Sequence, residues 1–211
     1  MNQTERNQIR RTMRRQRRAL SERERQRRSD ALVMRLMRTP MFRRSRHIAL
    51  YISNDGEVDL QALAERACQM GKCCYLPVLS PLFHNRLWFA PYRPDTRMVP
   101  NRFGIPEPKV AYSAIRRAWT LDLVLAPLVA FDAGGNRLGM GGGFYDRTFA
   151  YLNRRQRWRK PHILGTAFEF QRVGMLPCES WDVPMNGIVT ETRFYGLERG
   201  ADANPADTRG P

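Results

Sequence analysis

The sequence lacks the long apolar runs that mark a membrane protein. No stretch of the 211 residues approaches the length needed to cross a bilayer. The N-terminus carries no apolar segment behind its basic residues, which argues against a secretory signal. An Arg-rich, acid-poor start is also typical of organelle transit peptides, and that reading stays open as a minor alternative. We therefore expect a cytoplasmic protein without a membrane partner.

Cysteine and histidine are too sparse and too scattered for a structural metal site. The chain has four cysteines and three histidines, with no CxxC pair and no ligand spacing: Cys68, Cys73, Cys74, Cys178, His47, His84 and His162. This pattern argues against a zinc site and predicts reduced, buried thiols. The adjacent Cys73 and Cys74 are expected on opposite faces of a strand.

Basic charge is abundant and unevenly distributed. The chain has 36 basic and 20 acidic residues, a net charge of +16. Residues 1–46 alone hold 16 arginines against 4 acidic residues, or +12, and the rest of the chain contributes only +4. Such a block could bind nucleic acid, form a solvated helical face, or reach over a pocket to a phosphorylated ligand. Charge alone does not choose among the three.

The order of expected elements predicts an α/β fold. The length and the 42% apolar content favour one globular domain, placed here at residues 1–195 with a disordered tail at 196–211. Residues 1–46 are expected to form a basic helical segment packed on that domain. Helices are expected over 6–20, from Ser21 to Thr39–Pro40, over 60–70 capped by Asp59, and over 144–152. Strands are expected over 47–53, 73–79, 87–90, 121–132 and 162–168. Their alternation predicts a single layered domain with a mostly parallel or mixed central sheet flanked by helices.

A glycine-rich loop, NRLGMGGGFYDR at 136–147, is the most informative segment. Its glycines follow a buried strand and precede a helix, so the backbone can approach a ligand closely and offer several N–H groups to an anion. Arg137 could neutralise a phosphate, and Asp146 could hold Mg²⁺ against a polyphosphate. The loop lacks the Gly-Lys-Ser/Thr ending of a Walker A motif, and a plain flexible turn remains the alternative.

The loop and six other segments resemble the 5-formyltetrahydrofolate cyclo-ligase (methenyltetrahydrofolate synthetase) family. The segments occur in the expected order over residues 6–190: 9–21, 49–63, 71–79, 103–108, 122–132, 136–147 and 181–184. The resemblance implies a fold related to ribose-5-phosphate isomerase and CoA-transferase folds. It also implies an enzyme that uses MgATP to convert 5-formyltetrahydrofolate to 5,10-methenyltetrahydrofolate, ADP and phosphate.

The resemblance further implies a role for individual residues. Arg137 and Tyr145 are the catalytic candidates. The ATP-binding candidates are Arg6, Arg10, Arg137, Leu138, Gly139, Met140, Gly141, Gly142, Gly143, Phe144 and Tyr145. The folate-binding candidates are Ile52, Glu57, Phe103, Met140 and Phe144, and the metal candidates are Asp146 and Asn186. Arg14 and the remaining N-terminal arginines are expected to be solvated.

Two positions depart from the family pattern. Gly142 stands where some relatives carry a lysine, so Arg137 or the N-terminal arginines would have to compensate for one phosphate-facing cation. Asn186 stands where an aspartate can help to bind the metal, which leaves the second metal contact open.

Two other functions are compatible with parts of the sequence. A nucleic-acid-binding protein would use the arginine block, but that segment has no interleaved aromatic residues and leaves the glycine loop unexplained. Another phosphate-ligand enzyme of the same architecture is the third reading. We expect a monomer whose partners are ATP and 5-formyltetrahydrofolate, and nucleic acid is not the expected partner.

Overall fold

The protein, described by a computed structural model over residues 3–83, 85–102, 104–154, 160–177 and 179–197, is built on a seven-stranded sheet. The strands are β1 (His47–Ala49), β2 (Cys73–Leu79), β3 (Leu87–Tyr92), β6 (Leu123–Pro127), β9 (His162–Thr166), β10 (Gly187–Val189) and β11 (Phe194–Gly196). Their spatial order is β11-β10-β9-β6-β1-β2-β3. The five inner strands of the sheet run parallel to one another. The edge strands β11 and β3 pair antiparallel with β10 and β2. The predicted α/β fold with a mostly parallel sheet is confirmed.

The helices and two small hairpins surround this sheet. The helices are α1 (Gln3–Ala19), α2 (Glu22–Arg38), α3 (Pro40–Arg44), α4 (Gln61–Gln69), α5 (Phe144–Phe149) and α6 (Tyr151–Arg154), with 3-10 turns η1 (Tyr112–Ala114), η2 (Ala118–Thr120) and η3 (Glu169–Gln171). The hairpins are β4 (Met98–Pro100) with β5 (Pro106–Pro108), and β7 (Ala130–Phe131) with β8 (Arg137–Leu138). No helix among the described residues is long and apolar enough to span a membrane.

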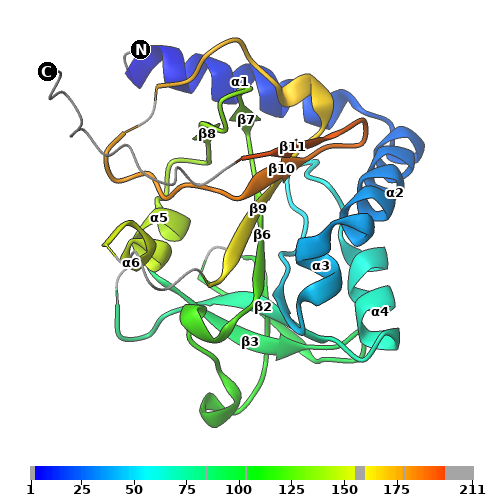
Figure 1. Ribbon diagram of the computed structural model, residues 1–211. Coiled ribbons are helices and arrows are strands. Elements are labelled where there is room, and N and C mark those ends of the chain that lie inside the picture. The colour runs from blue at the N-terminus through cyan, green and yellow to red at the C-terminus, as the bar shows by residue number, and fades with distance from the viewer. Residues whose placement is uncertain (1–2, 84, 103, 155–159, 178, 198–211) are drawn as a thin grey trace, which may run out of the picture.

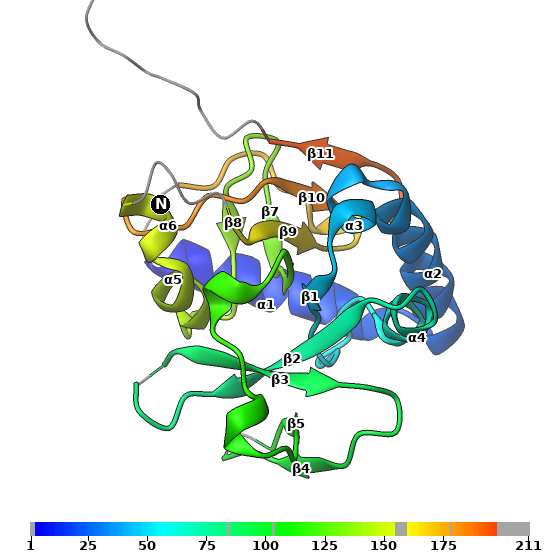
Figure 2. The same ribbon diagram turned by 60° about the horizontal axis from the view of Figure 1, so that its bottom comes forward.

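The two faces of the sheet bury separate apolar clusters. On one face, α2, α3 and α4 pack side chains such as Leu36, Phe42 and Leu63 against the strands. Figure 2 shows α5 on the side of the sheet away from α2, α3 and α4. Phe149 of α5 packs with Phe89 of β3 in the second cluster. Parallel strands covered on both faces are continuously apolar, which is why the sequence of β6 has no polar residue.

Helix α1 lies across the end of the sheet from which the chain leaves β6 (Figure 1). Its buried Met13 packs with Val129 and Leu138 beside the β7–β8 hairpin. The Arg17 side chain is fully buried and donates to the carbonyl oxygen of Leu128, the residue that follows β6, at 3.4 Å. The basic helix is therefore part of the folded body.

Several expected elements differ in extent. β1 ends at Ala49 instead of residue 53, because the chain leaves the sheet after Leu50 and turns toward α1. The run at 121–132 forms β6 and then β7, since Pro127 has no N–H to continue the ladder. The helix expected over 144–152 is broken at Ala150 into α5 and α6.

The starts of two helices test the capping predictions. Ser21 caps α2, and its Oγ accepts from the Glu24 N–H at 3.2 Å, as predicted. Asp59 is not the N-cap of α4, because that position belongs to Leu60. Its Oδ1 instead accepts from the Gln61 N–H at 2.9 Å.

Leu125 and Leu82 allow a matched test of the core. Leu125 of β6 is fully buried, whereas Leu82 is 64% exposed. We expect Leu125→Ala to lower the free energy of unfolding by about 2–5 kcal/mol, through lost burial and a residual cavity. Leu82→Ala removes the same atoms and should change it by less than about 0.5 kcal/mol. Urea denaturation measures both, and equal losses would show that β6 is not central to the core.

Candidate functional site

The central part of the glycine-rich segment, residues 139–143, forms a loop between β8 and α5 and is called the glycine loop from this point on. It contacts the N-terminal helix. Gly141 and Gly143 have φ of 95° and 62°, in the left-handed region that glycine enters without a steric penalty. Arg10 of α1 donates from Nε to the carbonyl oxygen of Gly139 at 2.9 Å. A helix and a loop 129 residues apart in sequence thus form one surface.

Two arginine side chains, Arg10 and Arg147, contact this loop, and the charge of a third, Arg6, acts on Arg10. Arg147 donates to the Gly142 carbonyl oxygen, and Arg6 forms an ion pair with Glu179 at 3.2 Å. Burial, followed by the neighbouring charge of Arg6, lowers the pKa of Arg10. Like charges held close together repel, and an anion between them relieves that repulsion. The surroundings of the loop therefore suit a phosphate group.

Arg137 precedes the glycine loop and Asp146 follows it, and their side chains contact each other. The Arg137 guanidinium forms an ion pair with Asp146 and donates to the carbonyl oxygen of Val183. Asp146 also accepts from the Val183 N–H at 3.3 Å. These contacts orient both side chains beside the loop.

The residues present fit a magnesium ion carried by a polyphosphate. Mg²⁺ commonly binds one or two carboxylates together with substrate phosphates and water. Asp146, whose side chain is 27% exposed, supplies such a carboxylate next to the loop. The described residues contain no group of three His, Cys, Asp or Glu side chains that would hold a metal by itself. The Asn186 Oδ1 accepts from the Ile163 N–H at 2.8 Å, which gives Asn186 a structural role between β9 and β10.

The turn after β1 is anchored to α1 by Asp55. Its carboxylate pairs with Arg14 at 2.5 Å and with Arg17 at 3.0 Å, and it also pairs with Arg18. Gly56 has φ of 73°, and a Cβ there would lie 3.0 Å from the Arg17 carbonyl oxygen. The expectation that these arginines are solvated was therefore wrong for Arg17, whose side chain is fully buried between Asp55 and the end of β6. Arg14 remains 36% exposed while it pairs with Asp55.

This anchored turn presents Glu57. The Glu57 side chain is 12% exposed, and one of its oxygens lies 3.7 Å from Arg17 Nη1. Burial raises the pKa of Glu57, more than the Arg17 charge lowers it. Burial, and then the charge of Glu57, raise the pKa of Tyr145, so this phenol stays protonated and can donate a hydrogen bond. The structure thus brings two predicted site residues into electrostatic contact.

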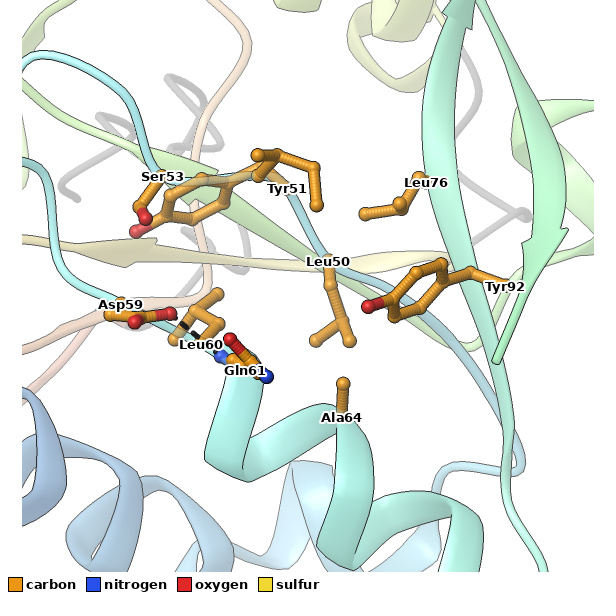
Figure 3. Close-up of a pocket in the computed structure, with 10 residues that line it drawn as sticks. Leu50, Tyr51, Ser53, Asp59, Leu60, Gln61, Ala64, Leu76 and Tyr92 are labelled. Atoms are coloured by element: carbon orange, nitrogen blue, oxygen red, sulfur yellow. Dashed lines mark hydrogen bonds between the residues drawn. The ribbon is translucent and has the colours of Figure 1, made fainter. Parts of the chain in front are cut away.

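A cavity of about 110 Å³ lies next to this turn and includes the predicted Ile52. Figure 3 shows Tyr92 of β3 pointing into it, with Gln61 at the start of α4 and Asp59 nearby. Sequence reasoning missed these three residues. Asp59 and Gln61 belong to the segment 49–63 that carried the resemblance, whereas Tyr92 gave no signal, because its position depends on the pairing of β3 with β2.

The remaining predicted residues fall into different environments. Leu138 is buried in the cluster beneath α1, and Met140 is 52% exposed at the loop surface. Phe144 packs at the edge of the second core cluster, beside Gly142. Phe103 lies outside the described residues.

The chain is similar to known proteins over nearly its whole length. The model of the 5-formyltetrahydrofolate cyclo-ligase family matches residues 2–191. The 5-formyltetrahydrofolate cyclo-ligase of Escherichia coli (strain K12) is 40% identical over 185 residues, which cover 87% of this chain and 98% of that protein. The protein of the same name from Haemophilus influenzae is 40% identical over 191 residues, 90% of this chain and 99% of its own.

Solved structures agree with these matches. The NMR structure of Aquifex aeolicus 5,10-methenyltetrahydrofolate synthetase has a TM-score of 0.76 and 31% identity, and covers 93% of this chain and 95% of its own. A Mycoplasma pneumoniae 5,10-methenyltetrahydrofolate synthetase at 23% identity has a TM-score of 0.67, with 88% and 98% covered, and supports the fold. The family match spans both the sheet and the glycine loop with its arginines. The chain therefore belongs to the 5-formyltetrahydrofolate cyclo-ligase family.

Proposed function

We propose that this protein catalyses the ATP-dependent cyclisation of 5-formyltetrahydrofolate to 5,10-methenyltetrahydrofolate, with release of ADP and phosphate. The contact of Arg10 with the glycine loop supports this function most directly. It joins the N-terminal helix and the loop, two segments of the family pattern, into one cationic surface. The proposed partners are ATP and 5-formyltetrahydrofolate, and the proposed state is a monomer.

The chemistry explains the use of ATP. N10 of the folate must attack the formyl carbon, after which the formyl oxygen must leave, and this oxygen is a poor leaving group. Transfer of the γ-phosphoryl group to that oxygen makes it a good one. When the C–O bond then breaks, phosphate departs, N10 loses its proton and the methenyl bridge remains. In such reactions the protein acts mainly by positioning and charge neutralisation.

The proposed roles follow from the geometry around the loop. The backbone of residues 139–143 would contact the ATP phosphates, with Arg6, Arg10 and Arg137 supplying cations. Arg137 would exchange Asp146 for a phosphate oxygen, and Asp146 would hold the Mg²⁺ that neutralises part of the phosphate charge.

The folate would lie beside the turn after β1. Glu57 would accept hydrogen bonds from the pterin N–H groups, and Ile52 would pack against the folate. Tyr145 would donate its hydroxyl proton in a hydrogen bond to the reacting formyl group, since burial keeps that phenol neutral. Met140, Phe144 and Phe103 complete the proposed folate contacts.

The direct test is a spectrophotometric assay of the full chain with MgATP and 5-formyltetrahydrofolate. We expect the near-ultraviolet band of the methenyl product to rise only when ATP and Mg²⁺ are both present. Folded protein that gives no rise would contradict the proposed function.

Arg10 and Arg11 form a matched pair for testing the nucleotide site. Arg10 contacts the glycine loop, whereas its neighbour Arg11 is exposed on the same helix. Loss of a charge-assisted contact should raise the KM for ATP roughly tenfold in Arg10→Ala. Arg11→Ala removes the same charge and should leave it within about twofold. Steady-state kinetics measure both, and equal effects would mean that only the overall charge matters.

Glu57 provides a test of the folate site. Glu57→Gln should raise the KM for 5-formyltetrahydrofolate at least roughly tenfold, because a charged acceptor is lost, and spare the KM for ATP. Glu22→Gln, an exposed change on α2, is the control. An effect on ATP instead would show that the two substrates have been assigned to the wrong ends of the site.

The raised pKa of Glu57 predicts a pH dependence of the same site. Only the carboxylate accepts pterin N–H groups fully, so kcat/KM for the folate should rise as pH increases through that pKa. The midpoint should lie above the ordinary glutamate value of about 4.3. The step should vanish in Glu57→Gln, and its persistence there would assign it to another group.

A further inference from the structure

Exposed aromatic side chains gather around a hollow that no residue of the glycine loop lines. Among the described residues four aromatic side chains are strongly exposed, and Trp181 is one of them. Two others, Phe83 and Trp119, are 47% and 49% exposed and line a single hollow, and the fourth, Tyr112, is 59% exposed and packs against Trp88 of the same hollow. Such clustering of aromatic groups marks a binding surface, whereas singly scattered ones need no explanation.

The hollow has a volume of about 300 Å³ and lies between the start of β3, the η2 turn and α5. Phe83 and Trp119 line it together with Trp88, whose ring packs edge-on against Tyr112 at 5.3 Å. Trp119 meets Tyr151 edge-on at 87°. The ring of Trp119 is thereby held in place while half of its surface stays open to solvent.

Two arginines line the same hollow without a carboxylate beside them. The Arg117 guanidinium carbon lies 3.9 Å from the centre of the Trp88 ring, and that of Arg86 lies 5.4 Å from the Phe83 ring. Among the described residues, no acidic side chain lines the hollow and neither arginine forms an ion pair. A guanidinium stacked on a ring keeps its N–H edge free for phosphate.

Charge indicates what kind of partner suits this surface. If two copies of the protein met through it, arginine would face arginine, and the net charge of +16 also opposes self-association. A polyanion with flat aromatic groups is complementary to both features. Unpaired bases stack on aromatic rings while basic side chains contact the phosphates, which is how single strands are bound without sequence preference.

We propose that Phe83, Arg86, Arg117 and Trp119, here called the β3–η2 surface, bind single-stranded nucleic acid. One base occupies the hollow against Trp119, and the two arginines contact the phosphates on either side. This site is separate from the residues that carry the proposed cyclisation. Unlike the N-terminal arginine block, the β3–η2 surface combines arginines with aromatic rings.

Fluorescence anisotropy with a labelled single strand of about 12 nucleotides tests the site. Trp119→Ala and the double variant Arg86→Ala/Arg117→Ala should each weaken binding at least roughly tenfold. The control Arg43→Ala/Arg44→Ala removes the same charge from exposed positions of α3 and should change it less than about threefold. Because Arg86→Ala/Arg117→Ala loses two phosphate contacts, it should also reduce the slope of log K against log salt by about 1.4. The control variant should leave this slope unchanged.

Four outcomes would overturn the proposal: no binding, equal losses in the two arginine pairs, equally tight binding of a duplex, or equally tight binding of polyglutamate. Self-association that Trp119→Ala abolishes would assign the surface to a second copy of the chain and overturn it as well. Cyclisation rates should be unchanged in all these variants, so that failure here is distinguishable from failure of the proposed activity.

Discussion

The buried ion pair between Arg17 and Asp55 is the constraint on which the candidate site depends. A fully buried guanidinium is costly unless its charge is paired. Asp55 pairs with Arg17 Nη2, and the Leu128 carbonyl oxygen accepts from Nη1, while Nε has no hydrogen-bond partner among the described residues. The pair joins three segments far apart in sequence: helix α1, the turn after β1 and the end of β6. Breaking it would leave a buried charge and remove one of the contacts that hold α1 against the sheet.

The rest of the site follows from that anchor. With α1 held across the end of the sheet, Arg10 reaches the glycine loop, four residues closer to the N-terminus than Arg14 on the same helix face. The same anchor orients Glu57, which lies two residues after Asp55 and beside the Arg17 guanidinium. One interaction thus places a cation at the proposed phosphate site and a carboxylate at the proposed folate site.

The family resemblance predicts that cations from outside the loop replace a lysine at position 142, and two arginines of other elements contact the loop. A Cβ added at Gly142 would lie 2.8 Å from the Phe144 ring, so a longer side chain there requires the ring to move. Arg10 and Arg147 contact the carbonyl oxygens on either side, at Gly139 and Gly142. Positive charge therefore reaches the loop from α1 and α5 instead of from within it. The arginines of α1 have different structural uses, since Arg10 contacts the glycine loop and Arg17 anchors the turn after β1, whereas Arg11 stays exposed.

Local and periodic features of the sequence determined much of the fold. The continuous apolar run of β6, the Ser21 cap and the order of strands and helices predicted the layered sheet, and the glycine loop marked the candidate site. These signals are readable because strand burial, capping and turn chemistry depend on neighbouring residues. Only the tertiary structure decided that β1 ends at Ala49, that Arg17 is buried, that Arg137 pairs with Asp146 and that Tyr92 lines the cavity. Each of these depends on which distant segments meet, and a charged or aromatic side chain has the same local sequence whether it faces water or a partner across the sheet.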